Sequence, residues 1–127
     1  MESSGLNALI VDEDDSFLGM AAVVLESLGF NAVTARDGDE ALAILQSRPS
    51  IALLLTEIVV PGAVDGGSDL ARLAKEANPR ISIVYTTRYG PMLLLDSEAP
   101  CDGLLLRKGG TRASWRQRCR RCWSARW

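Results

Sequence analysis

A short apolar stretch near the N-terminus, followed at once by a run of acids, decides the fold. It reads LNALIV at residues 6–11 and continues as DEDD at residues 12–15. Six residues suit a strand and are too few for a helix of ordinary length, so a buried strand is predicted that the acidic run ends. Similar apolar runs predict four more strands, at residues 31–35, 51–56, 81–86 and 103–107.

Amphipathic segments separate these predicted strands. Between residues 16 and 28 the apolar positions recur at spacings of three and four, which is typical of a helix, and Gly29 is placed to end it. Further helices are predicted at residues 38–47, 68–77 and 113–125. Parallel strands need crossover connections, so this alternation predicts an α/β fold with a five-stranded parallel sheet covered by helices on both faces.

Composition limits the class of protein. The chain has 127 residues, 47% of them hydrophobic and 24% charged, which predicts a single globular domain over residues 1–127. Neither a signal peptide nor an apolar run of membrane-spanning length is visible, so a cytoplasmic protein with no membrane partner is expected.

The chain has no histidine, which excludes a histidine base, a histidine metal ligand and a phosphohistidine. Its three cysteines are too few for a disulfide framework.

Charge is distributed unevenly along the chain. Residues 1–102 hold all 16 acids and 6 of the 14 bases, whereas residues 103–127 hold the other 8 bases and no acid. Such a stretch is either the solvated side of a helix or a tail for an acidic partner such as nucleic acid. Its Trp and Cys residues recur at helical spacing and are predicted to pack into the core. A shifted reading frame over residues 109–127 is a further interpretation of their unusual composition.

Polar residues follow the ends of the predicted strands. They are Asp12 and Glu13 after the first strand, Glu57 after the third, Thr86 at the end of the fourth and Lys108 after the fifth. In an open parallel sheet the strand ends meet at one edge, where ligands bind at the point at which the strand order reverses. Carboxylates gathered there repel one another and require a cation, for which Mg²⁺ is suited. The pattern therefore predicts a site for a metal ion and an anionic group.

Five segments together resemble the receiver domains of bacterial response regulators. They read LIVDEDD at residues 9–15, LLTEIVVPG at 54–62, DG at 65–66, VYTT at 84–87 and LRK at 106–108. The resemblance covers residues 6 to about 108 and is less secure over the divergent, arginine-rich residues 109–127. It implies a flavodoxin-like, doubly wound sheet with the strand order 2-1-3-4-5 and helices on both faces.

The resemblance implies a metal site and a phosphoryl acceptor. Asp12 and Glu13 match the acidic pair that helps to bind Mg²⁺, and the backbone carbonyl of Val59 matches a further metal ligand. Glu57 falls at the position of the aspartate that binds the metal and accepts a phosphoryl group from a histidine kinase. Mg²⁺ is therefore the implied cofactor, and weak binding or none is the expectation for this sequence.

The resemblance also implies how the phosphoryl group is sensed. Thr86 matches the hydroxyl residue that contacts the phosphoryl group and moves on activation, and Lys108 matches the lysine that pairs with a phosphoryl oxygen. Leu105 stands where the family usually carries an aromatic residue whose rotation is coupled to the threonine. A leucine can pack there but cannot repeat that rotation, which favours a loss of switching.

Glu57 is the largest departure from the family. Its carboxylate lies one methylene further out than that of aspartate, and a misplacement of about 1 Å can cost about 10²-fold in rate. Efficient phosphorylation of Glu57 is therefore not expected. Two interpretations stay open: a permanently switched receiver whose carboxylate reaches towards Lys108 and Thr86, and a receiver that has lost its switch.

The sequence thus predicts a stand-alone pseudo-receiver of a two-component phosphorelay, which acts through protein contacts and is not an enzyme. The expected partners are a histidine kinase, a downstream effector, or a second copy bound through the face of the fourth helix, fifth strand and fifth helix. Nucleic acid is not an expected partner. Two alternatives remain open: a metal-dependent receiver that accepts a phosphoryl group on another carboxylate such as Asp12, and a nucleic-acid-binding protein that uses the arginine-rich C-terminus.

Overall fold

Strands and helices alternate through the residues that the computed structural model describes, which are 6–47, 50–57, 67–87, 103–107, 111–117 and 119. The strands are β1 (Asn7–Val11), β2 (Asn31–Ala35), β3 (Ile51–Glu57), β4 (Ser82–Thr87) and β5 (Gly103–Arg107). The helices are α1 (Asp15–Ser27), α2 (Gly38–Ser47) and α3 (Gly67–Ala77). A further helical stretch at residues 112–117 and 119, which we name the C-terminal helix, follows β5. Each predicted boundary that falls in these ranges lies within one residue of the observed one.

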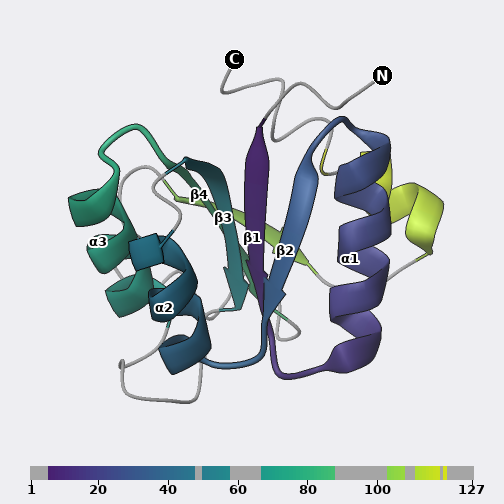
Figure 1. Cartoon of the computed structure of the whole chain (residues 1–127). Coiled ribbons are helices and arrows are strands. Elements are labelled where there is room, and N and C mark those ends of the chain that lie inside the picture. Colours follow the sequence, from purple (N-terminus) through teal and green to yellow (C-terminus); the bar gives the residue numbers. More distant parts are fainter. Residues whose placement is uncertain are drawn as a thin grey trace.

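The five strands form one parallel sheet in the order β2-β1-β3-β4-β5. This order confirms the predicted flavodoxin-like arrangement. Helices cover both faces, with α1 and the C-terminal helix on one side and α2 and α3 on the other (Figure 1). The strand predicted at residues 51–56 corresponds to β3, which is central and has five buried residues out of seven. Both of its faces are covered, as a near-continuous apolar run requires.

The core consists of two hydrophobic clusters, one on each face of the sheet. Alternate residues of the strands supply them, because successive side chains point to opposite faces. Leu9 and Leu54 belong to the cluster under α2 and α3, whereas Ile10 and Leu55 belong to the cluster under α1 and the C-terminal helix. No helix within the described ranges combines the length and the apolar character needed to cross a membrane.

The C-terminal helix is docked onto α1 by buried side chains. Trp115 is 0% exposed, and its ring lies edge-on to that of Phe17, with centroids 5.4 Å apart and planes at 88°. Cys119 is also buried. The guanidinium of Arg116 donates from Nε to Ser27 Oγ at 2.8 Å. Core packing of the Trp and Cys residues is thereby confirmed at 115 and 119, while Cys122 and Trp123 lie outside the described residues.

The end of α1 is set by Gly29, as the sequence predicted. Gly29 has φ 101, in the left-handed region that favours glycine. Its N–H donates to the carbonyl of Glu26 at 3.1 Å, and the N–H of Phe30 donates to the carbonyl of Leu25 at 3.0 Å. This pair of bonds is a Schellman motif, which satisfies carbonyls that the last helical turn would leave unpaired.

Candidate functional site

The candidate site lies where the strands end, at the lower edge of the sheet in Figure 1. Val11 is the register partner of Thr56, and Glu57 is the register partner of Thr86. Neighbouring strands lie about 4.8 Å apart. Asp12, which follows Val11, therefore stands level with Glu57 and Thr86 on three adjacent strands. The structure thus brings three of the predicted site positions together.

The side chains of these three residues share the face of the sheet that α1 covers. Each lies two residues after a strand residue that belongs to the hydrophobic cluster under α1. These strand residues are, in the same order, Ile10, Leu55 and Val84. Residues two apart on a strand point to the same face. Asp12 continues this pattern beyond the end of β1, since its N–H still pairs with β2, donating to the carbonyl of Ala35 at 3.1 Å.

The carboxylate of Asp12 is held by its own turn. Asp12 is 1% exposed, and its Oδ1 accepts a hydrogen bond from the N–H of Asp14 at 2.9 Å. A side chain that accepts from the backbone two residues on forms an Asx turn, for which Asp is one of the preferred residues. The turn therefore both ends the strand and fixes the direction of this carboxylate.

The other three acids of the run have separate tasks. Asp14 is the N-cap of α1, and its Oδ1 accepts from the N–H of Ser16 at 2.9 Å and of Phe17 at 3.4 Å. Asp15 begins α1 and forms an ion pair with Arg36. Glu13, predicted as the second metal ligand, is exposed on the turn. The acidic run at residues 12–15 therefore also forms the start of α1. Four consecutive acids along the chain gave no indication of this.

Thr86 presents a buried hydroxyl at this edge. The residue is 0% exposed, and its Oγ1 has no hydrogen-bond partner among the described residues. Glu57 therefore does not accept a hydrogen bond from its register partner. The Thr86 contact expected of a permanently switched receiver is not formed in this conformation, whereas the expected contact with Lys108 lies outside the described residues. A buried hydroxyl left unpaired costs about 1–3 kcal/mol, so this group favours a ligand that accepts a hydrogen bond from it.

Thr56 supports Glu57 from the opposite face of β3. It is fully buried, and its Oγ1 donates to the carbonyl of Glu57 at 3.0 Å. This bond fixes the direction of the Glu57 carbonyl. Sequence reasoning missed Thr56, because a threonine near a strand end carries no signal of such a bond.

The donor set fits a magnesium ion that keeps much of its water. Mg²⁺ is usually held by one or two carboxylates together with waters, and Asp12 and Glu57 are two carboxylates on adjacent strands. In the part of the chain that the structure describes, no three acidic or cysteine side chains gather closely enough to hold an ion by themselves. The residues present therefore fit a hydrated ion and not a cage built wholly of side chains.

Some predicted positions are not reached by the described residues. Val59 and Lys108 lie outside them, so their roles stay predictions. Leu105 lies in β5 as the register partner of Tyr85 on β4. Tyr85 is 3% exposed within the cluster under α2 and α3. An aromatic side chain therefore stands on the strand beside Leu105, at a position that sequence reasoning did not single out.

Comparison with known proteins places this site in a family. No family model matches the chain. Over 101 residues, however, it is 34% identical to the response regulator receiver protein CpdR of Brucella abortus, a match that covers 79% of this chain and 82% of that protein. The chain belongs to the response regulator receiver family. Receivers are modules of two-component signalling, in which they interact with histidine kinases and effector domains.

Two further relatives agree with this assignment. The receiver is 36% identical over 83 residues to the nitrogen assimilation regulatory protein NtrX of Azorhizobium caulinodans, but the match covers 65% of this chain and only 18% of that longer protein. The crystal structure of a response regulator receiver protein from Sinorhizobium medicae superposes with a TM-score of 0.78 at 25% identity, covering 98% of both chains. The fold and the family are therefore supported independently.

Proposed function

We propose that this receiver is a pseudo-receiver of a two-component phosphorelay, which transmits through protein contacts and is not phosphorylated at Glu57. The observation that carries the proposal is the position of Glu57. It is the last residue of β3, the register partner of the buried Thr86, and lies one strand from Asp12. The family resemblance implies that this is the place of the phosphoryl-accepting aspartate, and a glutamate occupies it.

The chemical reason is the length of the Glu57 side chain, which sets where its carboxylate oxygen lies. In-line transfer requires the attacking oxygen to lie against phosphorus with the other ligands already in place. The extra methylene of Glu57 moves that oxygen by about 1 Å, and displacements of this size can reduce the rate about 10²-fold. The Asx turn meanwhile holds the Asp12 carboxylate through the hydrogen bond from the Asp14 N–H. The site therefore keeps the charges of a receiver but misplaces the nucleophile.

Any Mg²⁺ bound here would be held by Asp12 and Glu57, with Glu13 and the carbonyl of Val59 as the further ligands that the family resemblance implies. When bound, the ion neutralises charge on phosphoryl oxygens. The chain's own contribution is to keep the Asp12 carboxylate in place by the bond from the Asp14 N–H. Weak binding is proposed, since Glu13 is exposed and not gathered with the other two acids.

Signalling through protein surfaces, and not catalysis or nucleic-acid binding, is the proposed output. The partners are a histidine kinase, an effector, or a second copy. Among the bases of the C-terminal helix, Arg116 donates from Nε to Ser27 on α1, which directs this side chain towards α1. Trp115 beside it is committed to the core.

Intact-mass measurement after incubation with Mg²⁺ and a small phosphodonor tests the proposal. The native chain, Glu57→Asp and Glu57→Gln should be compared. We expect a phosphoryl group on Glu57→Asp alone, because that substitution restores the reach of the nucleophile. Glu57→Gln is the matched control, since it keeps the length of Glu57 and removes its charge.

Two other results would change the proposal. A phosphoryl group on the native chain that is absent from Glu57→Gln would show that Glu57 is an acceptor, which the proposal denies. A phosphoryl group on native chain and Glu57→Gln alike would place the acceptor elsewhere, for instance at Asp12.

A further inference from the structure

The edge that carries the candidate site is crowded with carboxylates. The described stretches that directly follow β1 and β2, together with the last residue of β3, contain Asp12, Glu13, Asp14, Asp15, Asp37, Asp39, Glu40 and Glu57. Arg36 is the one base within these described stretches. Within these described stretches, every other formal charge is therefore negative.

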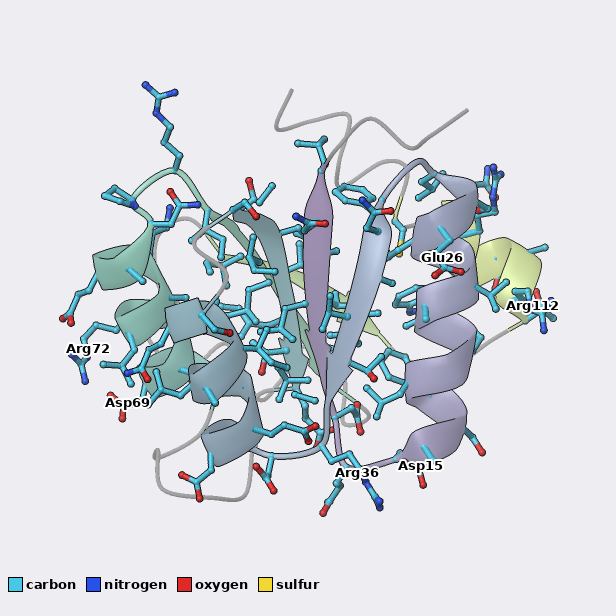
Figure 2. The ribbon with its side chains drawn as sticks, in the orientation of Figure 1. Asp15, Glu26, Arg36, Asp69, Arg72 and Arg112 are labelled. Atoms are coloured by element: carbon cyan, nitrogen blue, oxygen red, sulfur yellow. The ribbon has the colours of Figure 1, made fainter. Side chains whose placement is uncertain are left out.

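Arg36 is anchored to this edge at two points. Its backbone N–H donates to Glu40 Oε1 at 3.0 Å, and the N–H of Glu40 in turn donates to Asp37 Oδ1 at 2.8 Å, at the start of α2. Its Nε lies 3.2 Å from Asp15 Oδ1, so that the side chain reaches from the end of β2 to the start of α1 (Figure 2). The guanidinium thus has a defined position.

That position is beside the predicted metal ligands. Arg36 follows Ala35, whose carbonyl accepts the N–H of Asp12 at 3.1 Å. The ion pair with Asp15 is exposed, with 63% and 71% of the two side chains accessible. Exposed pairs contribute little to stability, so folding alone does not explain why a positive charge is held here.

We propose that Arg36 is a built-in counter-charge that lowers the affinity of this edge for divalent cations. The inference rests on the proposed metal site at Asp12 and Glu57. Arg36 repels an incoming Mg²⁺ and cancels the charge of Asp15, which would otherwise attract it. The receiver thereby keeps its acidic edge partly balanced without a metal ion.

The size of the effect follows from Coulomb's law. A unit charge about 10 Å from a divalent ion in water changes its affinity about three- to five-fold at low ionic strength. The effect should shrink as salt is added, because the Debye length at 0.15 M is only about 8 Å. If Arg36 changed the affinity for Mg²⁺ through a direct contact and not through its charge at a distance, the change would not show this salt dependence.

Calorimetric titration of MgCl2 into the full chain tests the inference. Arg36→Gln should bind Mg²⁺ about three- to five-fold more tightly than the native chain at low ionic strength. Arg36→Lys keeps the charge and should bind as the native chain does. Asp15→Asn should bind more weakly, and the double substitution of Asp15 and Arg36 should return close to native affinity, because their charges cancel.

Arg72 provides a matched control. It is an exposed arginine that pairs with Asp69 at 2.6 Å and Glu76 at 3.0 Å on α3, away from the site (Figure 2). The hydrogen bond that Arg72 donates to Asp69, followed by the charge of the same carboxylate, raises the pKa of Arg72 above its ordinary value, so its charge is constant during the titration. Arg72→Gln should leave Mg²⁺ affinity unchanged.

The outcomes separate this inference from the metal site on which it rests. Equal affinities of Arg36→Gln, Arg72→Gln and the native chain would overturn the role of Arg36 and leave the site standing. Binding that is detected only in Arg36→Gln would support the counter-charge directly. Absence of binding in every variant would overturn the metal site, and the inference with it.

Discussion

Replacing Trp115 with alanine tests whether the C-terminal helix is part of the folded unit. Trp115 is 0% exposed and meets Phe17 edge-on at 5.4 Å. Large-to-small substitution of a buried Trp costs about 3–5 kcal/mol, of which about 0.5–1.5 kcal/mol belongs to the aromatic pair. Domains of this size are stable by about 5–15 kcal/mol. The substitution should therefore remove a fifth or more of the free energy of unfolding.

Trp115→Phe refines the expectation. The indole Nε1 has no hydrogen-bond partner among the described residues, so replacing the indole breaks no described hydrogen bond. A phenyl ring still faces Phe17 and leaves a smaller cavity. The expected loss is about 1–2 kcal/mol, clearly less than for alanine.

Urea unfolding followed by far-ultraviolet circular dichroism measures these losses without relying on the tryptophan that is removed. Val23→Ala on α1 is the control, because Val23 is 47% exposed and exposed sites change stability by no more than about 0.5 kcal/mol. A loss below about 1 kcal/mol for Trp115→Ala, at an unchanged slope with urea, would refute the docking of this helix.

Three predictions concern the ends and the middle of α1, each measured by thermal or urea unfolding. Gly19→Ala should stabilise the chain by about 0.5–1 kcal/mol, because nothing lies within 4 Å of the added Cβ; destabilisation would contradict the open space. Gly29→Ala should cost about 1–2 kcal/mol at its φ of 101, and an unchanged stability would count against this conformation. Asp14→Ala should cost about 0.5–2 kcal/mol through the lost N-cap, whereas Asp14→Asn, which can still cap, should cost less.

The helices and strands could be predicted from the sequence because the spacing of apolar residues and the residues that end an element are local signals. The apolar run at residues 51–56 needs no knowledge of the rest of the chain, and Gly29 marks a helix end by its own conformational freedom. The strand order could not be obtained in this way and came from the family resemblance. Once the order is known, the ends of β1, β3 and β4 necessarily meet.

The parts of the site that escaped prediction depend on long-range geometry. Four consecutive acids look alike in sequence, but only the backbone turn decides that Asp12 faces the sheet and Asp14 caps α1. The proposed role of Arg36 depends on its place at the end of β2, next to Asp12 at the end of β1. The missing bond between Glu57 and Thr86 is a matter of side-chain conformation, which spacing along the chain does not encode.

The contact between α1 and the C-terminal helix has a consequence for synthesis on the ribosome. Ser27 and Arg116 are 89 residues apart in the chain, and translation at roughly 5–20 residues per second takes about 5–20 s to cover that distance. During this interval the apolar surface of α1 around Phe17 lacks the indole that later covers it. Nascent chains paused during this interval would expose the apolar face of α1, and they are the species that we expect chaperones to bind.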